Sequence, residues 1–451
     1  MKAKRLWSLW QSLLAPFAAC FTCPGWRRFV EWITGLALNA EQHTITQSLV
    51  GLGRAADWKA LESFAEYGAW DDHAVETALA RSLDDAPGRT WHGFCVLAGD
   101  DTKVHRNSRR VWGTCTFHEY SARCPNRAGT VRAHNWVVVG ALLGRPDQPA
   151  CFVPLAGRLY FRKSQLPPAG GGPEITFRTK NDLLVEMARV QAAATPDTYL
   201  LVFDGAFAVA NVVRPLVRPE AGQRRVHFLT RPRRNARLYE IPLWPWDRPG
   251  RNGRLPRWGK RLPPPSQGGR WGGGWQEGTA FAYGRQRSVR WKEVLGLWRV
   301  SGHDVVVKAV VAEVEGYRKR FTLVTSAVSL TGAQVVELFC ARFREEDGFR
   351  DLKQRLGWEE CRAWTRRPIE RTTQALFVTM ATLRRLEWSL VGLGEQDWWL
   401  RPPWNRRKVR PGVLDVQRLL RGERGELRRL LAGWLRNEAQ SGDVIEEAAG
   451  M

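Results

Sequence analysis

The chain has 451 residues, of which 44% are hydrophobic and 25% are charged, and its formal net charge is +24. This much apolar material can build a core, which excludes disorder as the dominant state. No run approaches the roughly 18 uninterrupted apolar residues of a membrane span, which excludes a polytopic membrane protein. The positive excess favours a polyanionic partner, with nucleic acid ahead of an anionic membrane surface.

Residues 1–90 are predicted to be helical, because apolar residues recur at spacings of three and four. A basic start followed by a Trp- and Leu-rich run imitates a secretory signal, but Ser8, Gln11 and Pro16 interrupt that run. An amphipathic first helix fits better, and its apolar face would consist of Trp7, Trp10, Leu13, Leu14 and Phe17. We therefore expect a cytoplasmic protein.

Residues 91–239 have the mixture of strands and helices that is typical of an α/β domain. Buried strands are predicted for four apolar runs, at residues 94–98, 134–143, 199–203 and 226–230. Residues 181–194 are predicted to form a helix between the second and third of these strands.

The remainder of the chain is predicted to interrupt and then complete this domain. Residues 240–330 begin with a segment rich in Gly, Pro, Arg and Trp, and continue with strand-like runs at 305–314 and 320–328. This pattern predicts a β-rich insertion. Helix resumes near 334, so residues 331–360 would complete the α/β core and residues 361–451 would form a helical C-terminal region.

Two of the predicted strands end on an acidic residue. Asp100 follows the run at 94–99, and Asp204 follows the run at 199–203. Ligands of open α/β sheets gather beyond the carboxyl ends of strands, and two carboxylates there would suit a hard divalent cation. The alternative is that Asp100 caps a turn and Asp204 starts a helix.

A third acidic residue lies on a predicted helix with basic neighbours. Phe339, Arg342, Glu346 and Lys353 are spaced by three, four and seven residues. At about 100° per residue they fall within a stripe of roughly 60° on one helix face. A surface ladder of ion pairs is one interpretation of this stripe. The other is a face that holds a metal ion on the glutamate and a phosphate backbone on its neighbours.

These motifs resemble a known family. The spacing of Phe339, Arg342, Glu346 and Lys353 is similar to the Y-R-E-K signature of the cut-and-paste transposases of bacterial insertion sequences, with Phe339 in place of Tyr. Asp100-Asp-Thr102 resembles the end of the first catalytic strand of that family, which is usually D-x-T. Leu201-Val-Phe-Asp-Gly205 resembles the end of the second, and residues 228–239 are similar to the stretch that follows it.

The resemblance implies an α/β fold with an RNase H-like catalytic core, a β-rich insertion, and helical N- and C-terminal regions. Its catalytic and metal-binding acids would be Asp100, Asp204 and Glu346, and the D-x-T register favours Asp100 over Asp101. The implied cofactors are two Mg²⁺ ions, with Mn²⁺ as a substitute. The implied DNA-binding residues are Arg342, Lys353, Phe339, Arg231, Arg233 and Arg234.

The implied function is DNA transposition. The enzyme would be a DDE transposase with endonuclease and strand-transfer activity, acting on double-stranded DNA at the terminal inverted repeats of an insertion sequence and at target DNA. Residues 1–90 would bind DNA, and a homodimer would act in the DNA complex near the bacterial nucleoid, with no membrane partner. A hairpin intermediate would need an aromatic pocket for a flipped base. The candidates are Trp258, Trp271, Trp275, Trp291 and Trp298.

Other interpretations stay open. A transposase-derived protein could bind DNA without cutting it, and a metal-dependent nuclease of the same fold could cut without strand transfer. A more remote alternative is a zinc-organised DNA-binding protein built on Cys115, His118, Cys124 and His134. The basic clusters at 224–237, 251–261 and 401–408 are candidate DNA-binding tracks.

Overall fold

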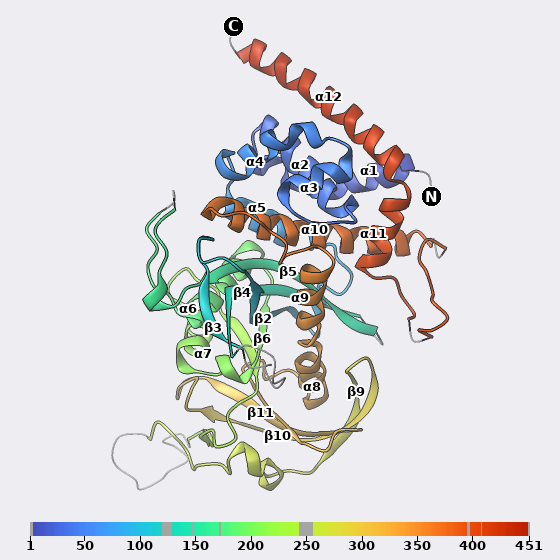
Figure 1. Ribbon diagram of the computed structural model, residues 1–451. Helices are drawn as coiled ribbons and strands as arrows, with labels where there is room; N and C mark the ends of the chain where they lie inside the picture. The colour runs from blue at the N-terminus through green and yellow to red at the C-terminus, as the bar shows by residue number, and fades with distance from the viewer. Residues whose placement is uncertain are drawn as a thin grey trace.

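A sheet of twelve strands runs through the middle of the protein (Figure 1). The computed structural model describes residues 3–119, 129–145, 148–170, 173–242, 256–394, 397–406 and 408–449. The predicted mixed α/β fold, with helical regions at both ends of the chain, is confirmed.

Five strands form the core of the sheet, in the spatial order β5–β4–β2–β6–β7. They are β2 (Phe94–His105), β4 (Thr130–Arg145), β5 (Gln148–Tyr160), β6 (Tyr199–Phe203) and β7 (Val226–Thr230). β4 is antiparallel to both β2 and β5, whereas β6 is parallel to β2 and β7 is parallel to β6. This arrangement is an RNase H-like core. The short strands β1 (Thr90–Trp91) and β3 (Cys115–His118) pair with β2 and β4.

The later strands extend this sheet instead of forming a sheet of their own. β12 (Phe321–Thr325) pairs with the core strand β7, and β11 (Val306–Val314) and β10 (Arg285–Trp298) follow in turn. β8 (Leu238–Tyr239) and β9 (Gln276–Ala282) both pair with β10. The predicted β-rich segment is therefore continuous with the core through β12, and the predicted domain boundaries stay predictions.

Helices cover both faces of the core sheet (Figure 1). α6 (Lys180–Ala194) and α7 (Ala210–Val217) lie on one face, and α9 (Arg344–Gln354) and α10 (Arg366–Gly392) pack on the other, against β5. α8 (Gly332–Ala341) precedes α9 and packs on β9 to β12. Since side chains alternate along a strand, consecutive residues of β2 face different helical layers.

The two ends of the chain form one helical region beyond the sheet. Its N-terminal helices are α1 (Ala3–Leu14), α2 (Cys23–Leu38), α3 (Ile45–Leu52), α4 (Trp58–Tyr67) and α5 (Asp72–Arg81). α11 (Val413–Gly422) and α12 (Arg424–Ala449) join them, and α1 packs on both α10 and α12. Short 3₁₀ helices are η1 (Ala15–Cys20), η2 (Ala55–Asp57), η3 (Lys163–Gln165), η4 (Gly205–Phe207) and η6 (Pro265–Arg270).

The predicted amphipathic first helix is confirmed. Its apolar side chains are buried against α10 and α12, with Leu14 fully covered and Trp10 only 1% exposed. The Trp10 indole N–H also donates a hydrogen bond to the Thr34 hydroxyl of α2 at 2.9 Å. Within the described ranges, none of the helices combines the length and apolarity that crossing a membrane would require.

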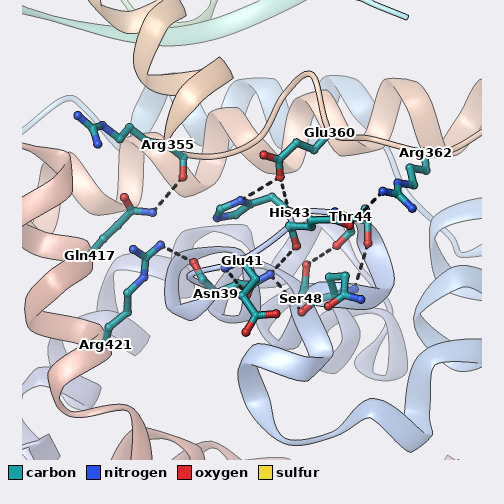
Figure 2. A network of polar contacts seen from close by, with 12 residues as sticks. Asn39, Glu41, His43, Thr44, Ser48, Arg355, Glu360, Arg362, Gln417 and Arg421 are labelled. Atoms are coloured by element: carbon teal, nitrogen blue, oxygen red, sulfur yellow. Dashed lines mark hydrogen bonds and ion pairs between the residues drawn. The ribbon is translucent and has the colours of Figure 1, made fainter. Parts of the chain in front are cut away.

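Polar contacts join three distant segments where the chain leaves α9 (Figure 2). The backbone N–H of His43 donates to Glu360 Oε2 at 2.6 Å, and Arg362 Nη2 donates to Gln42 Oε1 at 3.1 Å. From α11, the guanidinium of Arg421 donates to the carbonyl of Asn39. The first two bonds join the segment after α9 to the N-terminal region, and the third joins α11 to that same region.

Candidate active site

Parallel pairing puts the two predicted aspartates side by side. β2 and β6 are in register with Gly99 opposite Phe203, so Asp100 and Asp204 occupy the next position along each strand. β7 is in register with β6 in the same way, so Arg231 takes the corresponding place beside Asp204. Asp204 and Arg231 thus directly follow β6 and β7, and they lie level with Asp100, which is in the middle of β2.

The chain turns sharply after Asp204. Its Oδ1 accepts a hydrogen bond from the backbone N–H of Gly205 at 2.6 Å, and the Thr230 hydroxyl donates to its carbonyl at 3.3 Å. A Cβ on Gly205 would lie 2.9 Å from the carbonyl oxygen of Arg231, so only glycine lets the end of β7 approach this turn so closely. Three predicted DNA-binding side chains after β7 are exposed, namely Arg231, Arg233 and Arg234.

The Asp100 carboxyl group has a raised pKa. Burial raises the pKa of Asp100 to about 6, and the nearby carboxylates of Asp101 and Asp204 act in the same direction. The backbone N–H of Asp101 and the guanidinium of Arg342 oppose that rise. Carboxylates that lie close together with little solvent repel one another, and a bound cation would relieve this repulsion.

Asp101 belongs to the other face of the sheet. Lys180, at the start of α6, lies with its Nζ 2.6 Å from Asp101 Oδ2, whereas Asp100 faces the layer of α9 and α10. An ion pair with Lys180 compensates the Asp101 charge, whereas the Asp100 carboxylate accepts a hydrogen bond from Arg342. This geometry agrees with the D-x-T register and supports the assignment of Asp100 as the first acid.

The helix that carries the predicted signature is interrupted. The chain leaves α8 at Ala341 and enters α9 at Arg344, with i to i+3 backbone bonds from Phe343 to Cys340 and from Glu345 to Arg342. Such turns advance by about 120° per residue instead of about 100°. The predicted single helix is therefore wrong in detail, because it is interrupted between Ala341 and Arg344.

The break brings a different glutamate to the acids. Glu345 is fully buried, its carboxylate lies 3.6 Å from the Arg342 guanidinium, and Arg342 Nη1 donates to Asp100 Oδ2 at 3.2 Å. Burial raises the pKa of Glu345 well above its usual range, with Asp100 adding to the effect. Neither Glu345 oxygen has a hydrogen-bond partner among the described residues. Glu346 is exposed at the surface of α9.

The sequence analysis therefore missed Glu345, although one signal was present. Arg342 and Glu345 are three residues apart, which is a spacing that allows an ion pair on a helical turn. The family signature selects Glu346 instead, and the exposed position of that residue leaves its carboxylate accessible from solvent. Glu346 stays the predicted third catalytic acid, and Glu345 is a buried glutamate that directly precedes it.

Two further signature residues have structural partners. Lys353 Nζ donates to the carbonyl of Lys103 at 2.7 Å, which ties α9 to β2 three residues beyond Asp100. Burial lowers the pKa of Lys353. Phe339 is 4% exposed and contributes its ring to the core, where the Arg342 guanidinium lies 5.9 Å from the ring centroid. In this arrangement Phe339 supports Arg342 and is not accessible to DNA.

The candidates for an aromatic pocket are reduced to two. Trp271, Trp291 and Trp298 are buried in the core. Trp258 and Trp275 are half-buried, and three cationic groups lie within 6 Å of the Trp275 ring centroid. The predicted basic clusters at 251–261 and 401–408 are partly outside the described residues.

The zinc alternative has little support in the described part of the chain. Cys124 lies outside the described residues. Cys115 is buried while His118 is exposed, because a spacing of three residues puts them on opposite faces of β3. The His134 imidazole bonds to the Trp112 carbonyl at 2.7 Å, and burial lowers the pKa of His134 to about 3.

The acids at the strand ends fit a hard divalent cation by their chemistry. Carboxylate oxygens are the ligands that Mg²⁺ prefers, and the buried Glu345 oxygens lack hydrogen-bond partners among the described residues. Within the described ranges, however, no three His, Cys, Asp or Glu side chains lie close enough together to hold a metal ion. Arg342 instead occupies the position in front of Asp100.

An RNase H-like sheet with two carboxylates at adjacent positions of neighbouring parallel strands is typical of enzymes that cleave nucleic acids. The model of one protein family, described as DDE superfamily endonuclease, matches residues 16–295. The chain therefore belongs to the DDE superfamily endonucleases, and DNA is the substrate that this family implies. The match includes Asp100 and Asp204 and ends before α8. A comparison with curated proteins gave no match.

Proposed function

We propose that this endonuclease is a DNA transposase of the cut-and-paste type, encoded by a bacterial insertion sequence. Its catalytic acids are Asp100, Asp204 and Glu346. The observation that carries the proposal is the parallel register of β2 and β6, which aligns the first two acids at adjacent strand positions. The signature around α9 supplies the third acid together with Arg342 and Lys353.

In this proposal the three carboxylates hold two Mg²⁺ ions, for which Mn²⁺ can substitute. When bound, such ions lower the pKa of an attacking water or 3′-hydroxyl and stabilise the leaving oxygen at phosphorus. Arg342 and the exposed Arg231, Arg233 and Arg234 hold phosphates of the cleaved strand, and such contacts position the scissile bond without specifying sequence. Either Trp258 or Trp275 receives a flipped base during formation of hairpin ends.

The partners of this reaction are the terminal inverted repeats and the target DNA, and two protomers act together in the DNA complex. Two related functions compete with the proposal. A protein that only binds DNA would leave the substrate intact, and a nuclease would cut it without forming hairpins or joined strands.

The test is incubation of purified protein with the DNA that flanks its own gene, with Mg²⁺ present and with Asp204→Ala as the control. Products are sized on a denaturing gel. Nicks, hairpins or joined strands at fixed ends, absent with Asp204→Ala, support the transposase. Cut ends without hairpins or joining favour the nuclease, and salt-sensitive binding without cutting favours the DNA-binding protein.

A further inference from the structure

Two tight turns converge beside the candidate active site. Residues 283–287 include the turn between β9 and β10, and residues 315–320 connect β11 to β12. Arg287 Nη1 donates to the carbonyl of Glu315 at 2.9 Å, and the rings of Tyr283 and Tyr317 lie 4.9 Å apart. We call residues 283–287 and 315–320 together the paired-turn surface.

The paired-turn surface is strongly basic. It contains five cationic side chains and the single carboxylate of Glu315. Arg320 is engaged with Glu313, at 2.7 Å, and Arg287 lies over the Tyr317 ring. The other three cations, Arg285, Arg318 and Lys319, are exposed and make none of the ion pairs found within the described ranges. Their charges are thus uncompensated by neighbouring side chains.

Tyr283 has a backbone conformation that is unusual for its residue type. Its φ is 51° and that of Gly284 is 90°, so both residues of the two-residue hairpin turn have positive φ. Such turns normally take Asn-Gly, and a positive φ costs a residue with a Cβ about 1 to 2 kcal/mol. Strain of this kind is retained where the side chain has a specific task.

The side chain of Tyr283 connects the turns to the break between α8 and α9. Its ring lies 5.2 Å from that of Phe343, which is one of the two residues between α8 and α9. Phe343 directly follows Arg342, which bonds to Asp100. The paired-turn surface is therefore fixed to the same short segment that supplies Arg342 to the acids.

We propose that the paired-turn surface binds the phosphodiester backbone of DNA next to the bond that is cut, and that Tyr283 is the positioning residue that holds this surface against the α8–α9 break. The proposal rests on the proposed function, because the scissile bond is placed by the acids. Exposed guanidinium and ammonium groups without protein partners are suited to phosphate oxygens. The half-buried ring of Tyr283 and the exposed ring of Tyr317, whose centroids are 4.9 Å apart, keep the two turns together.

The test is a double variant, Arg318→Ala/Lys319→Ala, compared with Arg424→Ala/Arg436→Ala. The control removes the same charge from exposed arginines of α12, which lies at the far end of the molecule from β9 and β10 (Figure 1). Equilibrium binding of a duplex with the gene-flanking sequence is measured over a series of KCl concentrations. Thermal unfolding checks that both variants are folded.

Each phosphate contact contributes a slope of about 0.9 to the dependence of log K on log salt. We expect the slope to fall in magnitude by about 2 for Arg318→Ala/Lys319→Ala and to stay as in the wild type for the control. An unchanged slope in the first variant, or the same decrease in both, overturns the proposal.

Cleavage by the wild type and its loss in Asp204→Ala are measured on the same duplex. If cleavage behaves as expected while the slope is unchanged, the proposed function stands and the paired-turn surface has no role in binding. If the wild type binds no duplex DNA, both proposals fall.

Discussion

Arg342 Nη1 lies 3.2 Å from Asp100 Oδ2, which joins the break between α8 and α9 to the middle of β2. The same guanidinium is 3.6 Å from Glu345, so one cation serves two carboxyl groups in a largely buried place. A divalent cation at Asp100 would bind beside the Arg342 guanidinium, which already donates to Oδ2. The arginine therefore couples the charge state of the strand-end acids to the position of α9.

Removal of the Arg342 cation should destabilise the protein in a pH-dependent way. In Arg342→Ala, Asp100 and Glu345 lose their shared partner and must either stay protonated or carry unpaired charge. We expect a loss of about 3 kcal/mol in the free energy of unfolding at pH 8, and a smaller loss at pH 5, which is below the pKa of about 6 for Asp100. Urea unfolding at the two pH values measures this. Equal losses would show that Arg342 acts through packing alone.

The stability of the metal-free protein should depend on the titration of Asp100. Its pKa in the folded protein, about 6, lies above the ordinary value of 3.8, so the folded state binds the proton more tightly than the unfolded state. The resulting stabilisation is full below pH 4 and is lost as the pH rises through about 6, and its upper limit is about 3 kcal/mol. Asp100→Asn should remove this contribution.

Unfolding free energies measured with a chelator between pH 4 and pH 7 test that expectation. Asp85→Asn is a suitable control, because the Asp85 side chain is 77% exposed and its ion-pair partner is Arg385 of α10 and not a residue of the site. We expect the control to keep the wild-type pH dependence. An unchanged pH dependence in Asp100→Asn would mean that Asp100 is not the titrating group.

Neutral isosteres should separate the two adjacent glutamates. Glu346→Gln is expected to reduce cleavage by at least a hundredfold and to leave duplex binding and stability near wild-type values, because Glu346 is exposed. Glu345→Gln is expected to keep cleavage and to leave the fold intact, because the neutral form of Glu345 is already favoured by burial. Single-turnover cleavage assays and thermal unfolding give both readouts. The reverse result would make Glu345 the third acid.

The contact between α9 and β5 should tolerate no added methyl group. A Cβ on Gly348 would lie 2.4 Å from the Phe152 ring, so Gly348→Ala must push α9 away from the sheet. We expect a loss of about 1 to 3 kcal/mol in stability and a parallel loss of cleavage. Gly433→Ala in α12 is the matched control, because nothing lies within 4 Å of the added atom. It should stabilise the protein by about 1 kcal/mol.

The core strands could be predicted where they are apolar throughout. β6 and β7 have the predicted bounds, and their buried runs are bordered by polar residues that end them. β2 continues to His105, beyond the predicted end, because its later residues alternate between buried and partly exposed positions. β5 was not predicted, since Pro154 and Gly157 interrupt a run that only its pairing with β4 stabilises as a strand.

The candidate site was predictable only in part. Asp100 and Asp204 each come directly after a predicted apolar run. Parallel pairing of these two runs is sufficient to place the two aspartates at adjacent positions. The break after Ala341 has no glycine or proline to indicate it. At this break Arg342 bonds to Asp100, which is 242 residues away in the sequence. A contact between such distant residues leaves no local pattern from which the break could be predicted.

The long separation between Asp100 and Arg342 has a consequence during synthesis. A ribosome completes β2 and β6 well before it reaches the segment with Arg342, Glu345 and Glu346. The helices that support this segment, α10 and α11, are made later still, and the bonds from His43 to Glu360 and from Asn39 to Arg421 need both ends of the chain. A nascent or prematurely terminated chain therefore carries Asp100 and Asp204 without Arg342, without its bond to Asp100, and without the contacts between the two ends of the chain.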